Sequence, residues 1–476
     1  MDFSKVKTIY MIGIKGVGMT MLAEFLAHEG FSVSGSDTAE TFMTDSVLAQ
    51  AGIKVNQGFR VDHLVEDFDL IIYSTAYNEA NNEELKLAIA KKIKLVTFAE
   101  ALGAVFNLRH GIAVSGSHGK TTTTAWLGFV LEKTGLKPNV MVGAQVPQFN
   151  GAGLTGKSNY LVIEADEYQN KLQYFNPKLI LLNNIDYDHP DFYPTEASYE
   201  QAFIDFIKRL PKSGILIANF DDKIVKRLAK ENCQGKIISY GLENKDAMYS
   251  ASEIVWSPAS AGMTDQKQYF KVSLKDDEGK SDLGTFATLL PGKHSVLNAL
   301  AVIAASIELG AELHLIRRAL EEFTGTARRL QTLGEFKGAI LVDDYAHHPT
   351  EVQATMQAVK QKWPGKNIRV IFHPHTFSRT ESLLEDFAKS FKKANEVVVL
   401  PIYSSAREKE GIINNEGVAA AIKNNLTDKQ KIMTVNSLDE AENYLRETAT
   451  DKDVIILMGA GDVFRVGEKL ISNDKF

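Results

Sequence analysis

The chain has 476 residues, 44% of them hydrophobic and 24% charged, which is enough for about three domain cores. Its 53 basic and 60 acidic side chains give a formal net charge of −7, without a basic block of the kind that binds a nucleic-acid backbone. The single cysteine, Cys233, excludes an intrachain disulfide and fits a reducing compartment. No apolar run reaches the roughly 18 residues that a membrane span needs. We therefore expect a cytoplasmic protein that binds neither nucleic acid nor membranes.

The first part of the chain, residues 1–108, predicts a Rossmann-like α/β domain. Short β-branched runs alternate there with amphipathic stretches, a rhythm that is typical of a parallel sheet with crossover helices. A helix is expected between the first two strands and ends at about Gly30. The strands are expected at residues 7–13, 31–37, 69–76 and 94–98.

Glycines follow the first expected strand, and an acidic residue ends the second. These residues are Gly13, Gly16, Gly18 and Asp37, and together they have the outline of a dinucleotide site. Such a loop cradles a diphosphate and does not by itself identify the ligand. Because nothing in the next part of the chain resembles hydride chemistry, we do not expect a nicotinamide cofactor.

The pattern restarts at Gly111, and residues 109–325 predict a central α/β domain of the P-loop ATPase type. The segment from about Ala247 to Leu290 alternates as antiparallel strands do, and a helix is expected within residues 291–310. Before these, strands are expected from Gly111 and within residues 160–166, 179–186, 214–222 and 236–241.

A glycine-rich loop separates the first strand of this central domain from its first helix. Small residues let backbone N–H groups wrap phosphates, and the helix N-terminus adds its dipole. The lysine is suited to neutralise the β and γ oxygens of ATP, and the threonine after it to present a hydroxyl to Mg²⁺. The loop consists of Gly116, Ser117, His118, Gly119, Lys120, Thr121 and Thr122.

Two further side chains follow neighbouring strands of the central domain. Glu164 ends one strand, and His189 comes shortly after the next. Taken separately, an acidic strand end is usually a turn or a cap, and a lone histidine is usually packed or solvated. Beside a phosphate loop, however, the carboxyl ends of parallel strands meet at one sheet edge. We therefore expect a metal ion beside the phosphates, held by the acidic side chains at this edge, which are Glu164, Asp166 and Glu167, with His189 at the same edge.

The last part of the chain, residues 326–476, restarts the pattern once more and predicts a second Rossmann-like α/β domain. Helical stretches separate its hydrophobic runs, as expected for a parallel sheet. The strands are expected within residues 339–349, 368–375, 396–403, 432–435 and 454–462.

Nine short blocks recur in a fixed order over nearly the whole chain. They are GIKGVGM, GSHGKTTTT, EADE, NNIDYDH, PGKHSVLNALA, FTGTARRLQ, DDYAHHPTE, HPHTFSRT and GAGDV. In this order the blocks resemble the Mur ligase family, the ATP-dependent enzymes that build the peptidoglycan stem peptide on a UDP-sugar. Nine blocks in sequence are far more specific than any one of them.

The resemblance implies a role for each matching residue. It places the ATP phosphates on Gly116 to Thr122, and one or two Mg²⁺ ions on Thr121, Glu164 and His189. Further ATP contacts are implied for His294, Asn298 and Asp344. The UDP-sugar is implied at Gly13, Gly16, Gly18 and Asp37, and the incoming amino acid at Tyr345, His347, His375 and Arg379. Lys120, Arg329 and His347 are the implied catalytic residues.

The implied reaction uses ATP to convert the carboxylate of UDP-N-acetylmuramic acid to an acyl phosphate, which L-alanine then attacks. One alternative is a ligase that attaches a recycled murein tripeptide to the same sugar nucleotide, as the segment EADEYQN suggests. Another is a non-catalytic nucleotide-binding regulator. We expect a monomer or a weak homodimer.

Overall fold

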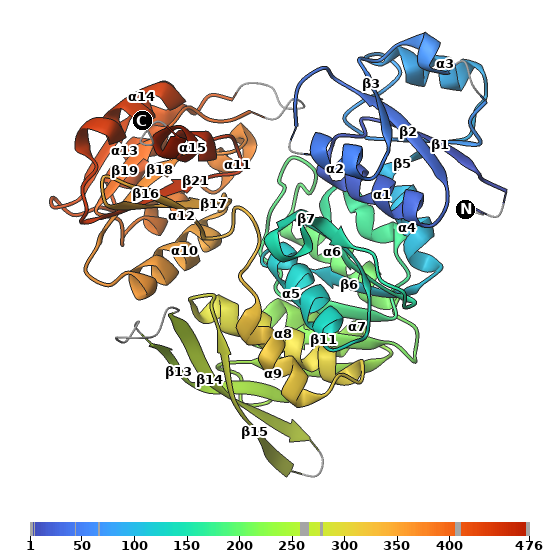
Figure 1. Ribbon diagram of the computed structural model, residues 1–476. Helices are drawn as coiled ribbons and strands as arrows, with labels where there is room; N and C mark the ends of the chain where they lie inside the picture. The colour runs from blue at the N-terminus through green and yellow to red at the C-terminus, as the bar shows by residue number, and fades with distance from the viewer. Residues whose placement is uncertain are drawn as a thin grey trace. The chain divides into compact units, whose positions relative to one another are not determined.

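The computed structural model describes residues 3, 5–42, 44–64, 67–257, 266–276, 279–404 and 411–472. Three sheets with their helices give an α/β fold of three domains (Figure 1), so the predicted fold class is confirmed. By its internal contacts the chain also divides into two compact units. The first comprises Met1–Ile185, Glu200–Met248 and Ala301–Ala319, and the second comprises Asp186–Tyr199, Tyr249–Leu300 and Leu320–Phe476.

The N-terminal sheet is parallel throughout, in the order β3-β2-β1-β4-β5. Tyr10 and Ile12 share a face of β1 and pack against Leu85 of α3, because alternate residues of a strand point to the same side. The glycine turn follows β1, where the strand order reverses. The elements are β1 (Thr8–Ile12), α1 (Val17–His28), β2 (Ser32–Asp37), α2 (Asp45–Gln50), β3 (Lys54–Gln57), η1 (Val61–Leu64), β4 (Leu70–Tyr73), α3 (Glu83–Ala90), β5 (Leu95–Thr97) and α4 (Phe98–Asn107).

The middle-sheet strands of the first unit run in the order β12-β11-β10-β6-β9-β7-β8, and only β8 is antiparallel to its neighbour. Since β6 lies between β9 and β10, the carboxyl ends of these strands meet where the phosphate loop begins. The strands are β6 (His110–Ser115), β7 (Asn139–Val146), β8 (Gly151–Leu154), β9 (Tyr160–Glu164), β10 (Leu179–Leu182), β11 (Ile215–Asn219) and β12 (Lys236–Gly241).

Helices connect these strands and follow them along the chain. They are α5 (Lys120–Lys133), η2 (Pro147–Phe149), η3 (Tyr168–Tyr174), α6 (Glu196–Lys208), α7 (Lys223–Asn232), α8 (Lys293–Glu308) and α9 (Leu313–Glu322). None of the helices among the residues that the structure describes is long and apolar enough to cross a membrane.

The second unit contains an antiparallel meander of β13 (Tyr249–Ser257), β14 (Lys267–Asp276) and β15 (Gly279–Thr288). Phe270 of β14 pairs with Phe286 of β15, and the two rings stack 6.1 Å apart. The antiparallel strands predicted between Ala247 and Leu290 are therefore confirmed.

The C-terminal sheet has the order β16-β17-β21-β18-β19-β20, and only the edge strand β16 is antiparallel. Its strands are β16 (Gln331–Phe336), β17 (Ala339–Asp344), β18 (Asn367–Phe372), β19 (Glu396–Val399), β20 (Lys431–Thr434) and β21 (Asp453–Met458). Its helices are α10 (Pro349–Lys362), α11 (Phe377–Ser382), α12 (Leu384–Ser390), α13 (Asn415–Lys423), α14 (Leu438–Thr448) and α15 (Phe464–Ser472).

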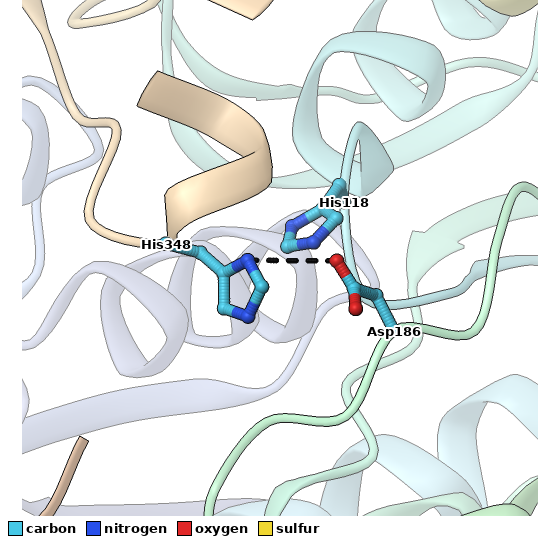
Figure 2. Close-up of side chains that lie close together, drawn as sticks. All are labelled: His118, Asp186 and His348. Atoms are coloured by element: carbon cyan, nitrogen blue, oxygen red, sulfur yellow. Dashed lines mark ion pairs between the residues drawn. The ribbon is translucent and has the colours of Figure 1, made fainter. Parts of the chain in front are cut away.

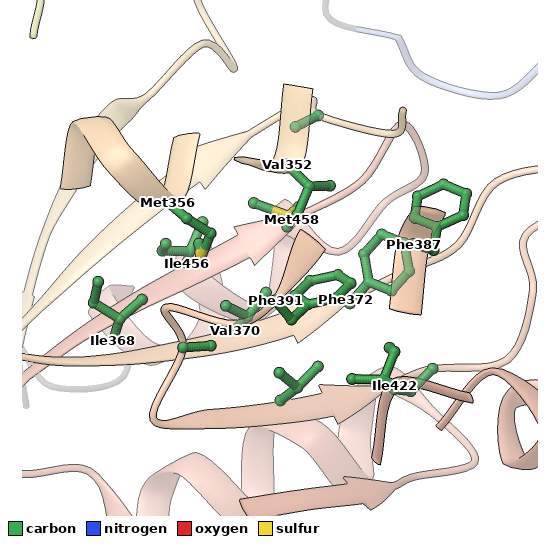
Figure 3. Packing of buried hydrophobic residues seen from close by; sticks show 14 of the residues in the cluster. Val352, Met356, Ile368, Val370, Phe372, Phe387, Phe391, Ile422, Ile456 and Met458 are labelled. Atoms are coloured by element: carbon green, nitrogen blue, oxygen red, sulfur yellow. The ribbon is translucent and has the colours of Figure 1, made fainter. Parts of the chain in front are cut away.

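Both faces of the C-terminal sheet are covered. Ile456 and Met458 of β21 pack with Val352 of α10 and Phe387 of α12, as Figure 3 shows. Ile455, which points to the other face, packs in a second cluster with α14 and α15. A strand buried on both sides reads as a continuous hydrophobic run, which explains why VIILM is easily recognised in the sequence.

Candidate active site

The phosphate loop between β6 and α5 depends on two glycines with positive φ. Gly116 has φ 126° and Gly119 has φ 77°, a region in which other side chains are strained. A Cβ on Gly116 would lie 2.8 Å from the carbonyl oxygen of Asn184, so the neighbouring backbone leaves no room for one. Gly119 is the N-cap of α5, which places the first N–H groups of that helix at the loop.

Two asparagines after β10 hold the loop from the side. The side chain of Asn184 accepts a hydrogen bond from the N–H of His118 at 2.8 Å and donates to its carbonyl oxygen at 3.1 Å. Asn183 donates to the same carbonyl at 3.3 Å and to the hydroxyl of Thr123 at 3.2 Å. These contacts between protein groups hold the loop in its shape. Neither asparagine is among the site residues predicted from the sequence.

The ammonium group of Lys120 is held inside the loop. It donates to the carbonyl oxygens of Gly116 at 2.6 Å and Ser117 at 3.2 Å, and to Oε2 of the buried Glu167 at 2.8 Å. Burial alone would lower the pKa of Lys120, but nearby carboxylates, with Glu167 foremost, outweigh that effect and raise the pKa. Lys120 is therefore charged where phosphate oxygens are expected.

Glu164 lies at the end of β9 and contacts the residue after Lys120. Its Oε1 accepts from the hydroxyl of Thr121 at 2.9 Å, and its Oε2 accepts from the N–H of Gly143 at 2.9 Å. Hydroxyl and carboxylate oxygens are the ligands that Mg²⁺ prefers, so this pair fits the expected metal. The other predicted ligand, His189, belongs to the second unit, where its N–H donates to Oδ1 of Asp188 at 2.7 Å.

The glycine turn of the N-terminal sheet is closed by Asp37. One carboxylate oxygen of Asp37 accepts from the N–H of Lys15 at 2.7 Å, and the other accepts from the N–H of Thr38 at 2.8 Å. A Cβ on Gly13 would meet the ring of Tyr77 at 2.7 Å, which explains the glycine at this position. The structure thus brings two of the predicted residues together, with Gly13 in the turn after β1 and Asp37 at the end of the neighbouring strand β2.

In the second unit, Arg379 of α11 makes a two-point contact with Asp188. Nε lies 2.8 Å from Oδ1 and Nη2 lies 3.2 Å from Oδ2, and both side chains are about 6% exposed. The Nη1 of Arg379 lies 3.2 Å from Nδ1 of His375. The guanidinium lowers the pKa of Asp188 even though burial opposes this shift. Asp188 is absent from the predicted site, although it lies directly before His189.

His347 lies among these side chains. Its Nδ1 is 2.9 Å from the carbonyl oxygen of Tyr345, and its ring centre is 6.1 Å from that of His375. Burial lowers the pKa of His347 to about 3, although the carboxylate of Glu351 opposes the shift. His347 is consequently a neutral imidazole at physiological pH.

Arg329 and Asp344 lie in the turn that precedes β16 and at the end of β17. Nη1 of Arg329 is 3.4 Å from Oε1 of Glu351. The buried carboxylate of Asp344 accepts from the N–H groups of Leu330 and Ala346, at 2.9 and 2.8 Å. Burial raises the pKa of Asp344 to about 6, although Arg329 opposes the shift. In this structure Asp344 shapes the turn that carries Arg329.

The start of α10 is fixed by a carboxylate from the segment after β10. Oδ2 of Asp186 accepts from the hydroxyl of Thr350 at 2.6 Å and lies 3.5 Å from Nδ1 of the buried His348. Figure 2 shows His348 and Asp186 facing each other and also draws His118 of the phosphate loop.

The two remaining predicted contacts for ATP lie near the start of α8, where His294 is exposed and Asn298 is buried.

Comparison with known proteins identifies the class to which this fold and site belong. Residues 8–120 match the Mur ligase family catalytic domain, residues 114–306 match the Mur ligase middle domain, and residues 328–461 match the Mur ligase glutamate ligase domain. The chain belongs to the Mur ligase family, and the resemblance predicted from the nine blocks is confirmed.

The similarity to individual members extends over whole chains. The UDP-N-acetylmuramate–L-alanine ligase of Desulfitobacterium hafniense is 36% identical, with 97% of this chain and 99% of the relative covered. The enzyme of the same name from Alkaliphilus metalliredigens is also 36% identical, over 99% and 98%. Among solved structures, the UDP-N-acetylmuramate–alanine ligase of Thermotoga maritima has a TM-score of 0.79 and 26% identity, with 99% of both chains covered.

Proposed function

We propose that the protein is an ATP-dependent ligase that joins L-alanine to the carboxylate of UDP-N-acetylmuramic acid in peptidoglycan synthesis, and that it works in the cytoplasm. The observation that carries this proposal is the full-length similarity to relatives of that name. The geometry at the end of β6 supports it, since Lys120, Thr121 and Glu164 lie together there.

The chemistry explains the need for positive charge. A carboxylate resists attack by an amine, because it is anionic and would have to expel an oxide. Transfer of the γ-phosphoryl group of ATP to this carboxylate gives an acyl phosphate with a good leaving group. We assign Lys120 and Arg329 to neutralise the charge that develops on the phosphoryl oxygens.

We infer that Mg²⁺ binds at Thr121 and Glu164, with His189 as a further ligand. When bound, one or two such ions would supply positive charge to the phosphate and acyl oxygens. For the other ATP contacts we retain the loop from Gly116 to Thr122, together with the nucleoside contacts predicted from the family, which are His294, Asn298 and Asp344.

We assign one substrate to each of the three predicted segments. Residues 1–108 would bind the UDP-sugar through Gly13, Gly16, Gly18 and Asp37, and residues 109–325 would bind ATP. Residues 326–476 would bind the amino acid through Tyr345, His347, His375 and Arg379. With a pKa of about 3, His347 is too weak a base to deprotonate an ammonium group, so we assign it to orient the amine by accepting a hydrogen bond.

One observation favours a second function, the attachment of a murein tripeptide to the same sugar nucleotide. The UDP-N-acetylmuramate:L-alanyl-γ-D-glutamyl-meso-diaminopimelate ligase of Neisseria meningitidis is similar to this chain, with a TM-score of 0.60 and 26% identity, and the similarity covers 68% of this chain and 100% of that one. The segment EADEYQN, which resembles that class of ligase, places Glu167 on Lys120 and so concerns the phosphate loop. None of the predicted contacts to the amino acid lies in this segment, so its resemblance does not bear on the choice of amino acid. We favour L-alanine for this reason.

The test is product analysis by mass spectrometry. Purified protein with ATP, Mg²⁺ and UDP-N-acetylmuramic acid should convert L-alanine to UDP-N-acetylmuramoyl-L-alanine, with one ADP released for each amide formed. ATP hydrolysis that does not depend on the sugar nucleotide would instead favour a nucleotide-binding regulator and contradict the proposal.

A further inference from the structure

The ion pair between Asp188 and Arg379 joins residues far apart in the sequence. Nε and Nη2 of Arg379 bind the two carboxylate oxygens of Asp188 at 2.8 and 3.2 Å, and both residues are buried. This is the geometry that the α-carboxylate of an amino acid would adopt on a guanidinium. The carboxylate that holds Arg379 in this structure is supplied by the protein itself.

The remaining N–H groups of Arg379 are fixed by this contact. A guanidinium has five N–H donors, of which Asp188 takes two. The third contact, from Nη1 to Nδ1 of His375 at 3.2 Å, takes one more. Among the contacts of the described residues, two N–H groups of Arg379 are not used, one on Nη1 and one on Nη2. The contact with Asp188 determines the direction in which they point.

The same contact sets the tautomer of His375. Because a guanidinium can only donate, Nδ1 of His375 must accept, and the proton of the neutral ring lies on Nε2. His347 has the opposite tautomer, because its Nδ1 donates to the carbonyl oxygen of Tyr345 at 2.9 Å and its Nε2 is the acceptor. The Nε2 atoms of the two rings therefore differ, with a donor on His375 and an acceptor on His347. An amino acid needs both, a donor for its carboxylate and an acceptor for its amine.

We propose that Asp188 is a positioning residue for the α-carboxylate of the incoming amino acid, an inference that rests on the proposed ligase function. Asp188 holds the guanidinium so that the outer N–H groups of Arg379 serve that carboxylate. Asp188 itself does not touch the substrate. The opposite view is a latch, in which Asp188 competes with the substrate for Arg379. The two views predict changes of opposite sign when the charge of Asp188 is removed.

The experiment compares L-alanine with L-alaninamide, which lacks the carboxylate, in wild-type protein and in Asp188→Asn. Asparagine keeps the shape but offers only one acceptor oxygen, so the guanidinium is free to turn. We expect the KM for L-alanine to rise about tenfold and the preference for L-alanine over L-alaninamide, as a ratio of kcat/KM, to fall by a similar factor. A general loss of site structure would lower kcat/KM for both substrates by the same factor and leave their ratio unchanged.

A second readout separates amine binding from activation of the sugar nucleotide. Hydroxylamine traps the acyl phosphate as a hydroxamate without using the amino-acid site. Hydroxamate formation in Asp188→Asn should stay within about threefold of wild type, since the phosphate loop is untouched. Asp188→Glu, which retains the carboxylate, should recover part of the preference for L-alanine. The matched control is Asp191→Asn, an exposed carboxylate in the same segment, which should resemble wild type.

Three results would overturn the inference. A lower KM for L-alanine in Asp188→Asn would establish the latch, and an unchanged preference over L-alaninamide would remove Asp188 from carboxylate recognition. A wild-type protein that forms hydroxamate but does not accept L-alanine would overturn the proposed substrate and the inference together. The first two results leave the ligase function intact.

Discussion

Nζ of Lys120 lies 2.8 Å from Oε2 of Glu167, and both side chains are withdrawn from solvent. The lysine of the phosphate loop therefore has a buried counter-ion within the protein. Removing one member of such a pair is costly, because the remaining charge is left without a partner. Stability and activity should consequently respond differently to changes in these two residues.

Lys120→Met should lower the rate of ADP release by about a hundredfold or more, because the positive charge on the phosphate oxygens is lost. Its melting temperature should also fall, since the buried carboxylate of Glu167 loses the ammonium group that lies 2.8 Å from it. The double variant Lys120→Met/Glu167→Gln should regain most of the melting temperature and none of the activity. Calorimetry and ADP-release rates on the single and double variants test this, and activity in the double variant contradicts the role of Lys120.

Glu164→Gln should weaken the response to Mg²⁺. The amide preserves the size of the side chain but removes a negative charge and one of the two acceptor oxygens that bind Thr121 and Gly143. We expect the Mg²⁺ concentration for half-maximal ADP release to rise about tenfold, with little change in melting temperature. Glu132→Gln is the control, because Glu132 lies near the other end of α5 and pairs with Lys137. An unchanged Mg²⁺ dependence would remove Glu164 from the metal site.

Gly143→Ala should produce a similar defect without altering a metal ligand. A Cβ on Gly143 would lie 2.6 Å from Oε2 of Glu164, so the carboxylate has to move away from Thr121. Gly151→Ala on the neighbouring strand β8 is the control, because a Cβ there has no atom within 4 Å. Titration of ADP release with Mg²⁺ should separate the two variants. If both behave as wild type, the placement of Glu164 does not limit the reaction.

His347 should make the stability of the protein depend on pH in the acid range. Its pKa is about 3 in the folded chain and 6.5 ordinarily. Above pH 6.5 the ring is neutral in both states and has no effect. As the pH falls from 6.5 toward 3, only the unfolded chain binds the proton, so the free energy of unfolding decreases by up to about 1.4 kcal/mol per pH unit. Between pH 6.5 and 5, the free energy of unfolding should therefore fall less for His347→Gln than for wild type. Urea unfolding measures both decreases, and equal decreases would contradict the lowered pKa of His347.

Much of the fold can be predicted from the sequence, because buried parallel strands appear as short hydrophobic runs between helices. The phosphate loop is equally easy to recognise in the sequence, since its backbone needs Gly116 and Gly119 and Lys120 follows directly. The strands β7 and β8 are not predicted, because their segment is rich in glycine and polar residues, among them Gly143, Gly151 and Gly153.

The partners of the predicted site residues are harder to find in the sequence. Asp188 and Arg379 are 191 positions apart, and no local pattern indicates that they meet. Glu167 is visible in the EADE block, but its contact with Lys120 depends on the path of the chain after β9. Residues that touch a ligand share recognisable motifs, whereas residues that hold them in place are defined by tertiary packing.

The central claim, ligation of L-alanine to UDP-N-acetylmuramic acid, is tested most directly by ADP release with this sugar nucleotide against L-alanine, glycine, L-serine and the murein tripeptide. The proposed function predicts that ADP release requires both the sugar nucleotide and an amine, and that L-alanine gives the highest kcat/KM. The kcat/KM for glycine should be lower than that for L-alanine by a factor that corresponds to about 1–3 kcal/mol, the contribution of one methyl-sized group. A higher kcat/KM for the tripeptide than for L-alanine would contradict the substrate, and ADP release without the sugar nucleotide would contradict the ligase.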